Sequence, residues 1–171
     1  MSAIEINALR ASPDIRRWLS EILIETVANG GSVSFMHPLQ PAAAGAFWDN
    51  ALAAVGRDER IILGAWDGEL LAGTVTLLLD CPPNQPHRGE IAKVLVHRSA
   101  RRRGIAERLM ERAEAEARAE GKTLLVLDAV TGDAAARLYA RIGWTTVGVV
   151  PNFALYPVGS PCDTTYFFKA I

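Results

Sequence analysis

Cysteine and histidine are scarce in this sequence, and their spacing fits neither a disulfide framework nor a metal centre. Its 171 residues include two cysteines, Cys81 and Cys162, and three histidines scattered along the chain. Neither cysteine stands near a histidine at a ligand-like spacing, so we expect no metal site. Because no secretory signal is evident, we expect both thiols to be reduced rather than paired.

Long apolar runs are lacking as well. No segment approaches the roughly 18 uninterrupted apolar residues of a membrane span, and the N-terminus has no basic stretch followed by an apolar core. We therefore expect a cytoplasmic protein without a membrane partner. Linker-like composition, internal repeats and low-complexity tracts are missing too, which predicts a single domain over residues 1–171.

Half of the residues are hydrophobic, and their periodicity predicts elements in the order βααβββαβαββ. Strands are expected over residues 4–9, 61–66, 69–79, 88–97, 124–127, 144–150 and 164–169, and helices after Ser12, after Pro41, over 105–120 and around 135–142. The apolar run 124–127 favours a central strand parallel to the one before it, so that a right-handed crossover closes a βαβ unit. The predicted fold class is mixed α/β, with a central mixed, twisted sheet of about seven strands flanked by four helices.

An arginine-rich segment joins the apolar strand to the amphipathic helix that follows it. Its residues are Arg101, Arg102, Arg103, Gly104, Ile105 and Ala106. A strand, a glycine turn and a helix N-terminus gather unpaired N–H groups and a positive dipole end, which suits an anionic ligand such as a pyrophosphate. Gly104 can adopt a positive φ, and Ala106 keeps the first helical turn slim.

Two other interpretations of the arginines are a solvated helix end and contacts with nucleic acid phosphates. The formal net charge of −1 and the pI near 6.3 argue against a nucleic-acid partner, because no basic stripe lies beyond this cluster. We therefore favour a small phosphorylated ligand.

Two carboxylates stand where the predicted parallel strands would place chemistry. Asp128 directly follows the run 124–127, at an edge where ligands bind and where desolvation would raise its pKa. The alternative is that Asp128 caps the next turn. Glu90 is expected by alternation to share a strand face with Val94 and Val96, which suits a charge only beside a wet cleft or a cation.

The pattern Arg101-x-x-Gly104-x-Ala106 resembles the signature of the GNAT superfamily of acetyl-CoA-dependent N-acetyltransferases, and the order of elements is also that of GNAT proteins. The resemblance implies a GNAT fold, acetyl-CoA as cosubstrate and no metal. It implies that the cofactor-binding residues are Leu95, Val96, Arg101, Arg102, Arg103, Gly104, Ile105 and Ala106.

The pair Leu138-Tyr139 matches a Leu-Tyr pair on the fourth helix of GNAT enzymes. In that family the tyrosine commonly donates a proton to the departing thiolate of coenzyme A, so the resemblance implies this role for Tyr139. The alternative is a core tyrosine whose hydroxyl bonds a backbone carbonyl.

Several segments look like the tabtoxin-resistance acetyltransferase group, which acetylates a β-lactam amino acid. They are Glu25-Thr26-Val27, Gly30-Gly31-Ser32-Val33, Phe35-Met36, Glu90 with Lys93, Asp128, and residues 163–169. This likeness implies Glu90 and Asp128 as catalytic acids, although Ala106 stands where that group has glycine. Ser32 and Phe35 are candidate substrate-binding residues, and the segment 32–36 is equally well interpreted as a turn with core anchors.

The expected activity is direct transfer of the acetyl group of acetyl-CoA to an amine or hydroxyl of a small molecule, with a toxin or antibiotic-like amino acid among the candidate acceptors. A carboxylate would serve as base and Tyr139 as acid. Two alternatives are a protein N-terminal or lysine acetyltransferase and a non-catalytic acyl-CoA-binding module. The sequence leaves both a monomer and a homodimer open.

Overall fold

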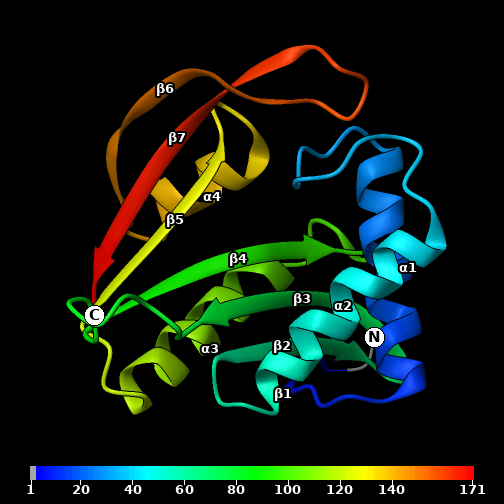
Figure 1. The fold of residues 1–171 in the computed structure, drawn as a ribbon, viewed down its shortest axis with the longest axis horizontal. Helices are drawn as coiled ribbons and strands as arrows, with labels where there is room; N and C mark the ends of the chain where they lie inside the picture. The colour runs from blue at the N-terminus through cyan, green and yellow to red at the C-terminus, as the bar shows by residue number, and fades with distance from the viewer. Residues whose placement is uncertain (1–2) are drawn as a thin grey trace.

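A seven-stranded sheet runs through the computed structural model, which describes residues 3–171 (Figure 1). Its strands are β1 (Glu5–Ala8), β2 (Arg60–Asp67), β3 (Leu70–Leu78), β4 (Arg88–Val96), β5 (Leu124–Val130), β6 (Thr145–Leu155) and β7 (Pro161–Ala170), in the spatial order β1-β2-β3-β4-β5-β7-β6. The helices are α1 (Pro13–Ala28), α2 (Pro41–Val55), α3 (Ile105–Ala119) and α4 (Ala134–Arg141). The predicted order of elements and the mixed α/β class are confirmed.

Local signals in the sequence set several element ends as expected. Ser12 Oγ accepts a hydrogen bond from the Ile15 N–H at 3.1 Å, with Pro13 at the first helical position of α1. A two-residue turn containing Gly68, whose φ is +63°, joins β2 to β3. Local chemistry was therefore sufficient at these boundaries.

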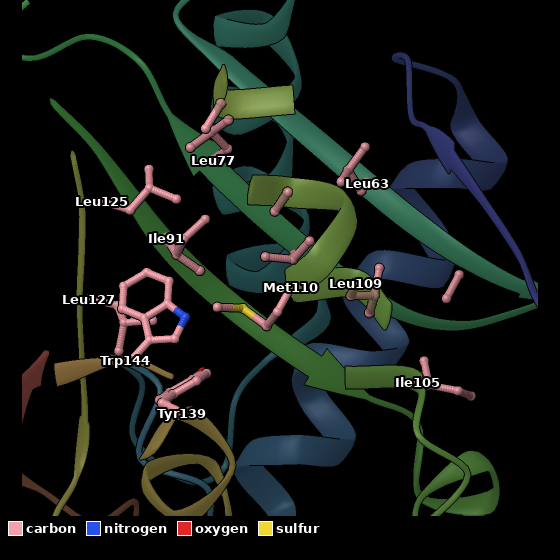
Figure 2. Close-up of a cluster of buried hydrophobic side chains, with 14 of the residues drawn as sticks. Leu63, Leu77, Ile91, Ile105, Leu109, Met110, Leu125, Leu127, Tyr139 and Trp144 are labelled. Atoms are coloured by element: carbon pink, nitrogen blue, oxygen red, sulfur yellow. The ribbon is translucent and has the colours of Figure 1, made fainter. Parts of the chain in front are cut away.

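Two apolar clusters pack against opposite faces of the sheet. Helices α1 and α2 cover one face with Leu19, Leu23 and Trp48 among the buried residues. Helix α3 covers the other face and buries its apolar side, together with side chains of α4 (Figures 1 and 2). The buried apolar residues of α3 are Ile105, Leu109, Met110, Ala113 and Ala117.

The parallel pair β4 and β5 separates after three residue pairs, the last of which is Glu90 with Val126. Figure 1 shows the two strands diverging from there. This divergence interrupts the sheet, and it positions the site described below.

Strand β4 contains a bulge that the sequence did not predict. Thr76 of β3 faces Ala92 while Thr74 faces Leu95, so β4 has one extra residue, and Lys93 adopts a φ of +51°. The expectation that Glu90 shares a face with Val94 and Val96 is wrong, because the bulge reverses the alternation. Val94 and Val96 pack with the α3 cluster, whereas Leu95 joins the α1 and α2 cluster.

The last strands are longer than expected. β5 continues to Val130, so Asp128 lies within the strand opposite Tyr166 rather than after its end. β6 extends to Leu155 with an irregular register between Val150 and Ala154. No helix within residues 3–171 combines the length and hydropathy that a membrane span needs.

Candidate active site

A cleft of about 680 Å³ opens where β4 and β5 diverge. Strand β4, the start of α3, β5 and α4 each contribute to its wall, as does the loop after α1. All predicted site residues except Arg103 and Phe35 line it, namely Ser32, Glu90, Leu95, Val96, Arg101, Arg102, Gly104, Ile105, Ala106, Asp128 and Tyr139. The structure therefore brings together residues that are up to about a hundred positions apart in the chain.

One end of the cleft is the N-terminus of α3. Gly104 caps the helix with a φ of +73° and supplies no side-chain cap, and Arg108 N–H makes the first intrahelical bond to the Gly104 carbonyl at 3.1 Å. The N–H groups of residues 105–107 have no intrahelical acceptor, and these residues line the cleft. A Cβ at Gly104 would meet nothing within 4 Å, so the open space and the positive φ both suit a cradle for an anionic group.

The three consecutive arginines diverge in their contacts. Arg101 Nε donates to the Val96 carbonyl at 3.2 Å, and Arg101 and Arg102 both line the cleft. Arg103 turns away, because its guanidinium pairs with the Asp67 carboxylate at 2.5 Å. It thus ties the loop to the β2–β3 turn, and, contrary to expectation, it does not line the cleft with Arg101 and Arg102.

Phe35 also lies outside the cleft. Its ring packs edge-on against Phe47 with centroids 5.3 Å apart, and it lines a second hollow of about 310 Å³. Ser32 borders both spaces, and its hydroxyl donates to the Leu155 carbonyl at 2.7 Å. The loop that carries Ser32 and Phe35 therefore forms a turn and also contributes to the walls of the cleft and the second hollow.

The two carboxylates face the cleft in different settings. Glu90 meets a cation, with its Oε2 3.6 Å from Arg88 Nη1. Burial raises the pKa of Asp128 above its ordinary value, and the positive charge of Lys93 opposes this rise. Asp133 caps α4, because its Oδ1 accepts a hydrogen bond from Ala136 N–H at 2.9 Å. Asp128 does not cap this helix, so its carboxylate is available to a ligand.

Lys93 is a cleft residue to which sequence reasoning gave no role. Its Nζ donates to Ser34 Oγ at 3.2 Å and lies 5.5 Å from the centre of the Phe47 ring. Burial lowers the pKa of Lys93, and the charges of Asp128 and Glu90 counteract this shift. A lysine within the apolar stretch from Ile91 to Val96 was the available signal.

Tyr139 is 4% exposed and packs beside Trp144 and Phe167, with ring centroids 6.2 and 5.9 Å away (Figure 2). Tyr139 therefore belongs to the core, as the structural alternative expected, but within residues 3–171 its hydroxyl makes no hydrogen bond to a backbone carbonyl. Burial raises the pKa of the phenol, and the charges of Asp133 and Asp128 raise it further. The phenol is therefore protonated at neutral pH.

The family model described as Acetyltransferase (GNAT) family matches residues 13–144. The chain belongs to this family. As a GNAT acetyltransferase it uses acetyl-CoA as the acetyl donor, and no group of three or more potential metal ligands occurs within residues 3–171.

Three solved structures are similar to the chain over nearly its whole length. An N-acetyltransferase from Staphylococcus aureus Mu50 is 20% identical, with a TM-score of 0.82 and 99% of both chains covered. A protein from Salmonella typhimurium, solved with its cofactor acetyl-CoA, is 20% identical, with a TM-score of 0.80 and 99% of this chain and 94% of that chain covered. A ribosomal-protein-alanine N-acetyltransferase from Brucella melitensis is 20% identical, with a TM-score of 0.80 and 96% and 99% covered. At these identities the likeness shows the fold.

Proposed function

We propose that this GNAT protein transfers the acetyl group of acetyl-CoA directly to the amine or hydroxyl of a small molecule. The observation that carries the proposal is that one cleft has a helix N-terminus, two carboxylates and a protonated tyrosine in its wall. These are an anion cradle, a choice of bases and an acid. No covalent enzyme intermediate is needed, because acetyl-CoA supplies an already activated acyl group.

The residues that would hold the cofactor fit its chemistry. The N–H groups of residues 105–107, with Arg101 and Arg102 nearby, suit a pyrophosphate. Leu95 and Val96 lie beyond the point where β5 leaves β4, so backbone groups on that side of β4 are open to a ligand with amides of its own. Backbone N–H groups at this end of β4 would polarise the thioester oxygen.

Two proton movements complete the proposed reaction. Asp128 or Glu90 accepts a proton from the acceptor ammonium, which frees the nitrogen lone pair to form the new C–N bond, and the second proton that the nitrogen loses as the amide forms passes to solvent. Tyr139 donates its phenolic proton to the sulfur as the C–S bond breaks, and it is reprotonated from solvent. Both carboxylates and the phenol line the same cleft, which supports their taking part in one reaction.

A protein N-terminal or lysine acetyltransferase and a non-catalytic acyl-CoA-binding module remain the competing functions. The carboxylates in the cleft favour catalysis over binding alone. An assay of thiol release separates the three possibilities, using acetyl-CoA with a pool of small amines, a pool of peptides, or neither. We expect release with the amine pool. Release with peptides alone would refute the small-molecule acceptor, and binding of coenzyme A without release in either pool would refute the enzyme.

A further inference from the structure

A second hollow adjoins the cleft on the side away from the α3 N-terminus. It measures about 310 Å³, and its wall includes Phe35 and Met36 from the loop after α1, Phe153 and Leu155 from β6, Thr164 from β7, and Asp128. Asp128 also lines the cleft. The two spaces thus meet at the residue proposed to receive the acceptor's proton.

The wall of this hollow is mostly apolar although it is open to solvent, and its polar residues are Ser32, Ser34, Asp128 and Thr164. Met36, Phe153 and Leu155 are 48%, 50% and 46% exposed, which is unusual for side chains of this size in one small region. Among the lining residues Asp128 is the only titratable one. Lys93 and Glu90 line the cleft and take no part in this wall.

Hydrogen bonds join the two sides of the hollow, the loop after α1 and the segment at the end of β6. Ser32 Oγ donates to the Leu155 carbonyl at 2.7 Å, and His37 N–H donates to the Pro157 carbonyl at 3.0 Å. On the β6 side, the Phe153 ring packs edge-on against Tyr166 with centroids 5.7 Å apart. The hollow is therefore a formed pocket, of a volume at the small end of ligand sites.

Resting on the proposed function, we infer that this hollow receives the body of the acetyl acceptor, and that the acceptor is a primary amine whose far end is an uncharged apolar group. The ammonium would lie at Asp128, where the hollow meets the cleft, and the apolar group would cover Phe35, Met36, Phe153 and Leu155. A second ammonium or a carboxylate at the far end would lose part of its hydration there, and apart from Asp128 the wall offers it no charged group.

A matched series of amines tests this inference. We expect kcat/KM to rise from ethylamine through butylamine to hexylamine by about fourfold for each methylene that is buried. At equal length, 1,6-diaminohexane should be at least tenfold poorer than hexylamine. A flat series, or a preference for the diamine, would overturn the inference while leaving the acetyltransferase proposal in place, because amines would still be acetylated. Absence of turnover with every amine would refute both.

Two variants of β6 locate the effect. Phe153→Ala should lower kcat/KM for hexylamine about tenfold and change that for ethylamine less than twofold, because only the longer amine reaches the ring. Val147→Ala is the matched control, since Val147 is also an exposed β6 residue, at 67%, but lies outside the hollow. Equal effects of both variants, or an effect of Phe153→Ala confined to peptide acceptors, would show that the hollow does not hold an amine tail.

Discussion

Replacing Glu114 by leucine should lower the free energy of unfolding by about 3 kcal/mol. The Glu114 carboxylate lies between α3 and the sheet with an 8% exposed side chain, and both of its oxygens accept a hydrogen bond from Lys169 Nζ at 2.8 Å. Trp144 Nε1 donates to the same carboxylate at 3.1 Å. Removing one partner of a buried pair costs about 3–5 kcal/mol. We choose the lower end because Lys169 is 23% exposed and keeps its bond to the Ile142 carbonyl.

Urea unfolding and a thermal scan measure the loss. For a chain of this length, about 3 kcal/mol corresponds to a fall in Tm of about 6–12 °C. The matched control is Glu116→Leu, which removes a partly exposed partner of the exposed Arg112 on the same helix and should cost less than about 1 kcal/mol.

A double variant separates the loss of a bond from the burial of an unpaired charge. Adding Lys169→Met to Glu114→Leu removes the orphaned ammonium and should restore most of the stability. A single variant within about 0.5 kcal/mol of the wild type would refute the argument, since normal surface substitutions have effects of that size. The absence of any recovery in the double variant would refute the charge argument alone.

Three further predictions concern the cleft. Tyr139→Phe should lower kcat about tenfold or more and leave the affinity for acetyl-CoA nearly unchanged in single-turnover and binding measurements; lost stability with intact turnover would make the tyrosine structural. Asp128→Asn should reduce the rate by about 10²–10⁴ if Asp128 is the base, and Glu90→Gln if Glu90 is. A base acts when it is ionised, so activity falls as the pH drops through the pKa of the base. If Asp128 is the base, Lys93→Gln removes the positive charge that opposes the rise in the Asp128 pKa. The acidic limb of the kcat/KM profile should then move to higher pH. Ala106→Glu should abolish the roughly 2.7 kcal/mol of stabilisation expected from coenzyme A at a hundredfold its Kd, as a thermal scan will show.

Much of the fold was predictable because its signals are local. The Ser12 cap depends only on residues of its own helix. The run 124–127 predicts a buried strand because its apolar residues are uninterrupted, unlike those of an exposed strand. The parallel pairing of β4 with β5 then followed from the helix between them. The helix cap at Gly104 and its positive φ were predictable for the same reason, because they depend on a few adjacent residues.

Features set by distant contacts were not predictable. Three adjacent arginines look alike in the sequence, and only the presence of Asp67 across the fold draws Arg103 away from the cleft. The length of β5 depends on pairing with β7, which continues through Asp128 although the apolar run has ended. The bulge at Lys93 has no local signature, since a positive φ at a lysine is not a residue preference.

The bulge at Lys93 and the divergence of β5 act on the same strand and decide what β4 presents to the cleft. Without the extra residue, Lys93 would share the face of Ile91 and point into the apolar cluster under α3, where an ammonium has no partner. With it, Lys93 reaches Ser34 and the neighbourhood of Asp128. Because β5 has already left, the backbone groups of β4 beyond Glu90 lack a strand on that side and need other partners. In the proposed reaction, one irregular strand would therefore serve both substrates, with its open backbone edge suited to the amides of the donor and its displaced lysine beside the proposed base for the acceptor.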